Sequence, residues 1–132
     1  MKEIKFRKFC TSSGKDVVCG KDAEQNELVV AQSGSLESVL HTKAPGSPFC
    51  NIKGKASPKD IKETAVICAA HSKDWKTNKG NVEIHCFKGK DIFKDSTMKT
   101  GTFGVKKAKS LAVKKADIMK LLRETGRKIE NG

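Results

Sequence analysis

The stretch from Val39 to Phe49 constrains the fold most, because it places a Pro-Gly pair between two short apolar runs. Proline fixes φ, and glycine tolerates a positive φ. The tetrapeptide at 44–47 therefore predicts a tight reversal that joins two strands, over residues 36–42 and 49–53. Such a reversal directs backbone N–H groups, Lys43 and Ser47 to one side, which suits an anion such as phosphate. A purely structural hairpin with a solvated tip explains the same residues.

Helix signals follow on both sides of this hairpin. Asp22 is an N-cap candidate with Gln25 three residues later, which predicts a helix over about residues 22–32. Ser57 followed by Pro58 predicts a second helix over about residues 57–76. A short basic helix is expected over about residues 117–125, ending before Gly126.

Alternating apolar residues predict the remaining strands. These strands cover residues 4–10, 16–19, 82–87, 92–93, 102–105 and 110–113. Strands in runs with helices between them predict an α+β fold with a mixed, mostly antiparallel sheet. We expect one domain over residues 1–132, with a core over about 4–113 and a basic C-terminal extension over 114–132.

The cysteines and the lengths of the apolar runs indicate the cellular compartment of the protein. Five cysteines, an odd number, include no C-x-x-C pair, and each occurs in an apolar run. We therefore expect buried, reduced thiols and no zinc site. No apolar run is as long as a membrane span, and the first residues do not form a signal peptide. The prediction is a cytoplasmic protein without a membrane partner.

Charge is the strongest compositional fact. The 27 Lys and Arg residues exceed the 15 Asp and Glu residues, giving a net charge of +12. Residues 1–57 hold nine basic and six acidic side chains, and residues 58–132 hold eighteen and nine. This distribution indicates a polyanionic partner, most often a nucleic acid. Nearly all of the basic residues are lysines, which suit phosphate contacts more than bidentate reading of bases. A solvated, lysine-rich surface is the structural alternative.

Nothing in the sequence assembles a catalytic site. His41, His71 and His85 have no partner at metal-ligand or triad spacing, and no phosphate-binding glycine motif occurs. Cys86 follows His85 directly, but neighbouring strand residues point to opposite faces. The predicted protein is not an enzyme, and it needs no cofactor or metal. The chain has no Tyr, one Trp and six Phe. Phe9, beside two basic residues, is the best candidate for a stacking platform, so we expect backbone-led binding with little base selectivity.

Several segments together resemble the RNA-binding (R) domain of the NFACT family, across roughly residues 4–113. The segment Gly20-Lys-Asp-Ala-Glu-Gln-Asn-Glu-Leu28 is similar to the family's G-[RK]-N-x-x-Q-N-D-x-L. Leu40-His41 and Pro45-Gly46-Ser47 resemble its W-x-H and P-G-S-H. The other matching pieces are Phe9-x-Thr-Ser-Ser-Gly14, Ala-x-x-x-Ala-Ala-x-Ser-Lys over residues 65–73, and Val82-Glu83-Ile84.

The chain departs from the family pattern at two positions. Val39 stands where the family has tryptophan, and Pro48 replaces the histidine after Gly-Ser. If those aromatic residues stack on RNA in relatives, that contact is lost here. The family includes ribosome quality-control factors and bacterial proteins first described as fibronectin-binding. This chain resembles a stand-alone R-domain protein, without the other large regions of those factors.

The resemblance and the charge together imply a non-catalytic protein that binds ribosomal RNA of the large subunit or tRNA. The expected contacts are Lys21, Gln25, Asn26, His41, Lys43, Gly46, Ser47, Lys53, Lys55, Lys106, Lys107, Lys109, Lys114 and Lys115. Gln25 and Asn26 have a structural alternative, in which they cap the helix and bridge to the Pro-Gly turn. Two other functions remain open: a protein-interaction module on the ribosome or another surface, and a backbone-led binder of duplex DNA.

Overall fold

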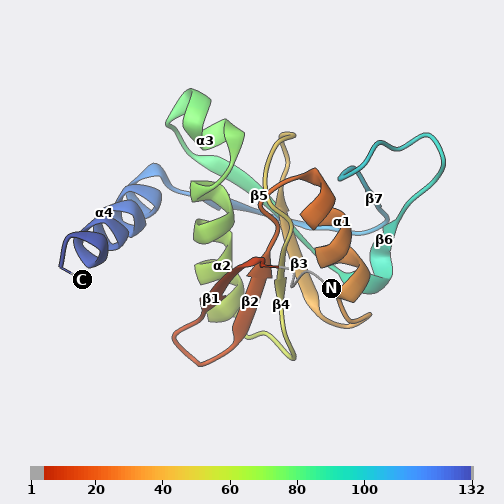
Figure 1. Ribbon diagram of the computed structural model, residues 1–132, viewed down its shortest axis with the longest axis horizontal. Coiled ribbons are helices and arrows are strands. Elements are labelled where there is room, and N and C mark those ends of the chain that lie inside the picture. The colour runs from red at the N-terminus through yellow and green to blue at the C-terminus, as the bar shows by residue number, and fades with distance from the viewer. Residues whose placement is uncertain (1–4, 132) are drawn as a thin grey trace.

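The computed structural model describes residues 5–131, and side chains up to residue 125. Its main element is a six-stranded sheet with strand order β1-β2-β4-β3-β5-β8 (Figure 1). The strands are β1 (Arg7–Cys10), β2 (Asp16–Cys19), β3 (Ser38–Thr42), β4 (Cys50–Ile52), β5 (Val82–Lys88) and β8 (Lys109–Val113). A short separate ribbon pairs β6 (Ile92–Phe93) with β7 (Gly104–Val105). Every pairing between the described strands is antiparallel. Ile4, the first residue of the strand predicted over 4–10, lies outside the described residues.

The predicted hairpin around the Pro-Gly turn is present. Strands β3 and β4 pair antiparallel, with Val39 opposite Asn51 and Leu40 opposite Cys50. Val39 and Leu40 are neighbours in one strand, so their side chains point to opposite faces of the sheet. Both are fully buried, because a helix covers each face.

One helix packs on each face of the sheet. Helix α2 (Pro58–Ala70) covers the face that includes Leu40, where Cys19, Cys50 and Cys68 join the larger apolar cluster. Helix α1 (Ala23–Gln32) covers the other face through Val29, which packs with Val39 and with two phenylalanines of a smaller cluster. A sheet whose described strand pairings are all antiparallel, with a helix on each face, confirms the predicted α+β class.

The helix predicted over residues 57–76 is wrong in extent, because the chain turns at His71 and Ser72. Helix α2 begins at a capping box, in which Ser57 Oγ accepts from Asp60 N at 3.1 Å and Asp60 Oδ2 accepts from Ser57 N at 2.9 Å. It ends at Ala70, and a separate helix α3 (Lys73–Asn78) follows. Ser72 divides the two, since its Oγ accepts from Trp75 N at 3.1 Å and caps α3.

The helix predicted over residues 117–125 is also longer than expected. Helix α4 covers Lys115–Asn131 and continues through Gly126. One glycine weakens a helix by only about 1 kcal/mol, so a glycine alone does not end one. The fully buried Ile118 holds α4 against the main core. Figure 1 shows the rest of α4 extending away from the sheet. Among the described helices, none combines the length and apolar character needed to cross a membrane.

The five cysteines differ more in exposure than the sequence predicted. Cys19, Cys50 and Cys68 are buried, and Cys86 is partly buried. Cys10 is exposed, so the expectation of burial is wrong for this residue. It lies on the edge strand β1, on the opposite face from Phe9, which packs against the main core.

Candidate nucleic-acid interface

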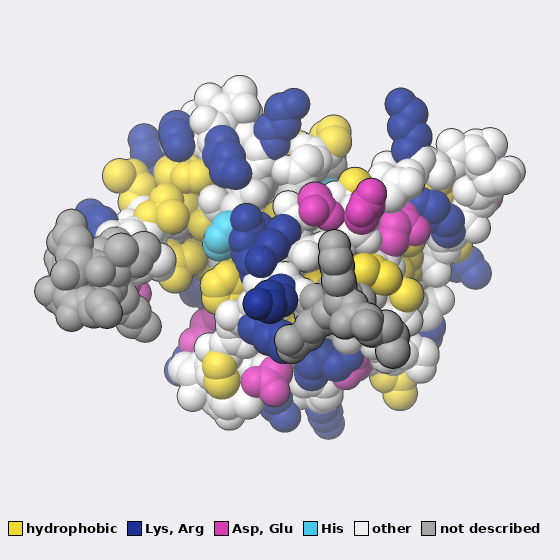
Figure 2. All heavy atoms as spheres, in the orientation of Figure 1, with side chains coloured by type: hydrophobic (Ala, Val, Ile, Leu, Met, Phe, Trp, Pro, Cys, Tyr) yellow, Lys and Arg dark blue, Asp and Glu magenta, His cyan; other side chains and the backbone are white. Residues whose placement is uncertain are grey.

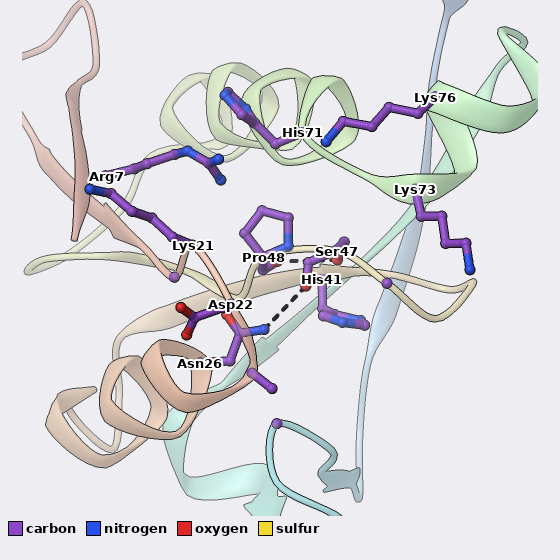
Figure 3. A pocket seen from close by; sticks show the side chains of 14 residues that line it. Arg7, Lys21, Asp22, Asn26, His41, Ser47, Pro48, His71, Lys73 and Lys76 are labelled. Atoms are coloured by element: carbon purple, nitrogen blue, oxygen red, sulfur yellow. Dashed lines mark hydrogen bonds between the residues drawn. The ribbon is translucent and has the colours of Figure 1, made fainter.

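A cleft of about 460 Å³ opens beside the β3–β4 turn, between β1, the start of α1 and helix α3 (Figure 3). Among the described residues that line it, Asp22 is the only acidic one. Four cationic residues line it: Arg7, Lys21, Lys73 and Lys76. Figure 3 shows Arg7 and Lys21 on one side of the turn, with Lys73 and Lys76 on the other. A concave surface with this excess of positive charge attracts an anion.

The surrounding surface is divided by charge. On the face drawn in Figure 2, Lys and Arg side chains spread across the middle and the upper margin. Acidic side chains gather over α1, which carries Glu24 and Glu27. The positive side of this face is therefore the side of the cleft that includes α3.

Asn26 joins α1 to the turn that forms the floor of the cleft. Its side chain is buried, with Nδ2 donating to Ser47 O at 3.3 Å and Oδ1 accepting from Phe49 N at 3.0 Å. A Cβ at position 20 would lie 2.2 Å from Asn26 Oδ1, so Gly20 is required for this close approach. Both polar groups of Asn26 are thus satisfied by backbone, which is the structural role that the sequence left open.

Gly46 and Ser47 shape the turn from within. Gly46 has φ +89°, and a Cβ there would lie 2.9 Å from the Cβ of Lys73. Its carbonyl oxygen accepts from Lys73 N at 2.7 Å, which ties the turn to α3. Ser47 is buried, and its Oγ accepts from Thr42 N at 3.0 Å and donates to Pro48 O at 3.1 Å. The turn is therefore fixed by backbone contacts to both helices that flank the cleft.

The start of α1 presents Lys21 at the rim. Asp22 Oδ1 accepts from Gln25 N at 2.9 Å, which confirms the predicted N-cap. Gln25 Oε1 accepts from the backbone N–H of Lys21 at 2.9 Å, and its Nε2 donates to Lys5 O at 3.2 Å. Gln25 thus fixes the backbone of Lys21 by a hydrogen bond, while Lys21 itself is exposed to solvent.

The two histidines of the cleft favour the neutral form. Burial lowers the pKa of His41, and the nearby His85 lowers it further, against a hydrogen bond to Thr42 O. Burial also lowers the pKa of His71, with added repulsion from Arg7 and a nearby lysine. In each ring Nδ1 lies against a carbonyl oxygen, at 2.7 Å for His41 and 2.9 Å for His71. Nδ1 therefore carries the proton, and Nε2 of the neutral ring is an acceptor.

The structure brings five of the residues predicted from the sequence to the cleft. These are Lys21, Asn26, His41, Gly46 and Ser47. Lys43 lies beside it and forms an exposed ion pair with Glu83 at 3.7 Å. Lys55 is exposed in the loop after β4.

Lys53 follows β4 at the end of the strand far from the cleft, and its ammonium group takes part in a hydrogen-bond network there. Its Nζ lies 2.8 Å from Glu37 Oε1, and it also donates to Gln32 Oε1 at 2.9 Å and Asn51 Oδ1 at 3.0 Å. Partial burial would raise the pKa of Glu37, but the hydrogen bonds from Lys53 and from two backbone N–H groups lower it to about 2. This ammonium group is therefore already surrounded by acceptors.

The lysines predicted near the C-terminus gather elsewhere, along the edge strand β8. Lys107 and Lys109 line a hollow of about 480 Å³ together with Lys88 and Lys90, near the other end of β3. We call this hollow the edge hollow. Lys106, Lys114 and Lys115 are exposed on either side of β8.

Sequence reasoning missed four basic residues of the cleft: Arg7, His71, Lys73 and Lys76. A signal for Lys73 was present, since Ser72-Lys73 ends one of the segments that resemble the NFACT family. The predicted continuous helix over 57–76 concealed its meaning. The break at Ser72 turns α3 toward the Pro-Gly turn and places both of its lysines at the cleft.

Comparisons with known proteins identify relatives of this domain. The family model described as "NFACT protein RNA binding domain" matches residues 5–107. The archaeal Rqc2 homologue aRqcH of Methanocaldococcus jannaschii is 27% identical over an alignment of 107 residues, and the match covers 75% of this chain and 16% of that protein. A solved structure, the C-terminal part of the fibronectin/fibrinogen-binding protein from Streptococcus suis, has a TM-score of 0.77 at 20% identity. That match covers 86% of this chain and 47% of the streptococcal chain.

The family match covers well over half of the chain and includes every cleft residue. The structural match has the same fold at low sequence identity. The chain spans less than half of either relative, so its likeness concerns this domain. The chain therefore belongs to the NFACT RNA-binding domain family.

Proposed function

We propose that this chain binds ribosomal RNA of the large subunit or tRNA through the cleft, without catalysing a reaction. The observation that carries the proposal is the placement of four cationic residues around a rigid turn, with one acidic residue among the lining. The family to which the chain belongs is one of RNA-binding domains. Phosphate groups of RNA are the anions that this geometry suits.

The chemistry of the cleft supports binding over catalysis. Its histidines donate Nδ1–H to backbone carbonyls of their own elements, and neither is paired with a nucleophile in the described contacts. The hydroxyl group of Ser47 is used within the turn, where it accepts from Thr42 N and donates to Pro48 O. Among the described residues, no group of three or more His, Cys, Asp or Glu side chains is placed to hold a metal ion.

A role in ribosome-associated quality control, in the cytoplasm, is the cellular setting that we propose. The archaeal relative is named as an Rqc2 homologue, and its match covers 75% of this chain. This chain corresponds to only 16% of that protein, so the proposal is limited to contact with RNA on the ribosome.

Salt-dependent binding tests the proposal directly. We expect purified protein to bind large-subunit ribosomal RNA or tRNA tightly at low salt, with an affinity that falls as salt rises. The double substitution Lys73→Glu and Lys76→Glu removes two expected phosphate contacts and adds repulsion. We expect it to weaken binding by about 10-fold or more and to lower the salt slope by about 1 to 2.

The matched control is Lys59→Glu with Lys62→Glu, an equal charge change on the exposed side of α2 away from the cleft. Equal losses from the two pairs would mean that only net charge matters, and the cleft assignment would be wrong. Duplex DNA added as competitor tests the DNA alternative: displacement of RNA at equal concentration would favour it. Negligible RNA affinity at low salt would leave the protein-interaction alternative.

A further inference from the structure

A second hollow, of about 390 Å³, adjoins the cleft on the other side of the Pro-Gly turn. His41, Gly46 and Gly101 line both hollows, so a ligand chain can pass from one to the other without leaving the surface. The second hollow differs from the cleft in its walls, which are rich in rings. We call it the aromatic pocket; its ring-bearing residues are His41, Phe49, His85, Phe87 and Phe103.

The rings form a connected set. His41 packs on Phe49 with 4.3 Å between ring centroids, and Phe103 meets Phe49 edge-on at 5.2 Å. Phe49 and Phe87 are buried, whereas His41, His85 and Phe103 are partly exposed. His85 is the direct neighbour of His41 across strands β3 and β5. The buried rings thus support three rings that solvent can reach.

Phe103 is the last residue of the loop that joins β6 to β7, and this loop is fastened to α1. Lys94 Nζ lies 2.6 Å from Glu27 Oε2 and 4.6 Å from the centroid of the Phe103 ring. Gly101 N also donates to Glu27 Oε2, at 2.6 Å. Gly101 has φ +80°, and a Cβ there would lie 2.8 Å from the Cβ of Ala23. The loop between β6 and β7 is therefore anchored to α1 at Lys94 and at Gly101, and the Phe103 ring is pre-organised beside the pocket.

The polar groups of the pocket suit the edge of a nucleobase. The proton of His41 is on Nδ1, at Thr42 O, so its Nε2 accepts hydrogen bonds. His85 Nε2 lies 3.4 Å from Glu83 Oε2, and Lys43 Nζ lies 3.7 Å from the same oxygen. These groups offer donors and acceptors next to flat apolar walls, the combination by which proteins bind unpaired bases.

We propose that the aromatic pocket binds one unpaired nucleobase of an RNA strand whose phosphates lie in the cleft. This inference rests on the proposed function, and it adds base stacking to an interface that the sequence predicted to be led by the RNA backbone. A paired base is stacked inside its helix and cannot enter such a pocket. The ligand is therefore a single-stranded segment, a loop or an end rather than a continuous duplex.

The test compares two RNAs, a short single strand and a fully paired, blunt-ended duplex of similar length. Phe103→Leu removes the aromatic face and keeps an apolar side chain against Phe49. We expect it to weaken single-strand binding by about 10-fold and duplex binding by less than about 2-fold, as loss of one base stack would. A 2-aminopurine base in the single strand should be quenched by the unchanged protein and less so by this variant.

Phe93→Ala is the matched control, because Phe93 lies in β6 directly before the same loop, is 41% exposed and does not line the pocket. His85→Ala is a second pocket variant that leaves the Phe49–Phe103 contact intact. If single-strand and duplex affinities stay at the unchanged protein's values in both pocket variants, the pocket does not bind a base, while the proposed function stands. If the unchanged protein binds neither RNA at low salt, the proposed function itself fails.

Discussion

The cleft and the edge hollow carry similar charge but differ in how that charge is supported. Around the cleft, Asn26, Gly46 and Ser47 fix the backbone from which the cationic side chains project. The edge hollow has four lysines, and the described hydrogen bonds of their ammonium groups include only Lys88 to Ser38 Oγ, at 3.4 Å. Its lysines lie on or near an edge strand that is mostly exposed.

This difference separates two kinds of positive surface. A fixed backbone holds cations at constant spacing, so a bound phosphate chain meets them without further ordering of the protein. Flexible lysines on an exposed edge attract any polyanion, with little preference for its shape. We therefore expect the cleft to determine which RNA is bound, and the edge hollow to add to affinity generally.

The substitution with the largest expected effect removes the rigidity of the cleft. Gly46→Ala forces a side chain into positive φ and against Lys73, so it should lower the free energy of unfolding by about 2–4 kcal/mol. Gly54→Ala is the matched control, since Gly54 has φ +79° and nothing within 4 Å of an added Cβ. It should cost only about 1 kcal/mol. Denaturant unfolding measures both, and equal losses would show that contact with α3 is unimportant.

Reversing two charges at the edge hollow is expected to reduce RNA affinity less than reversing two charges at the cleft. Lys107→Glu with Lys109→Glu changes the net charge as much as the Lys73 and Lys76 pair. We expect a loss of RNA affinity of about 3-fold, similar for RNA and for a simple polyanion such as heparin, because only the general field is altered. A loss confined to RNA and as large as that of the α3 pair would instead place a specific contact at the edge.

The smallest expected effect is a dependence on pH. Burial lowers the pKa of His41 and of His71 below the usual 6.5, so both rings are neutral at pH 7 and become cationic only as the pH falls through these lowered pKa values. RNA affinity should rise by a few-fold as they protonate, since cationic rings in the cleft would attract phosphate. His41→Asn with His71→Asn should abolish the rise; an unchanged pH profile would exclude both rings from the contact.

The same lowered pKa values of His41 and His71 give stability the opposite pH dependence, since acid pH weakens the folded state. Because each folded-state pKa is lower than the unfolded value, the unfolded chain binds protons more readily. The stability that the neutral rings contribute is complete above about pH 6.5 and is lost as the pH falls through the folded-state pKa values. Thermal unfolding in the absence of RNA should therefore show a lower midpoint at acid pH, separating this effect from the gain in binding.

Local signals predicted much of this fold. The caps at Asp22 and Ser57 start helices where expected, and the Pro-Gly pair forms the expected hairpin turn. Two helix ends were predicted wrongly: Ser72 ends α2 earlier by capping α3, and Gly126 does not end α4. Whether Ser72 caps a new helix depends on whether the first turn of that helix contacts another segment. Here it does, because Lys73 N donates to Gly46 O. That contact spans residues too far apart for a local pattern to indicate.

The sequence by itself determined the class of protein: one basic α+β domain, with the NFACT motifs around Gly20–Leu28 and Pro45–Ser47. Charge and short-range backbone preferences are properties of neighbouring residues, so they can be read directly. Only the tertiary structure decided which residues do what. It assigned Asn26 and Ser47 to the frame, drew Lys53 into a network with Glu37, and brought Arg7, Lys73 and Lys76 to one cleft. Those roles depend on packing between distant segments, which burial and backbone hydrogen bonds establish only once the chain has folded.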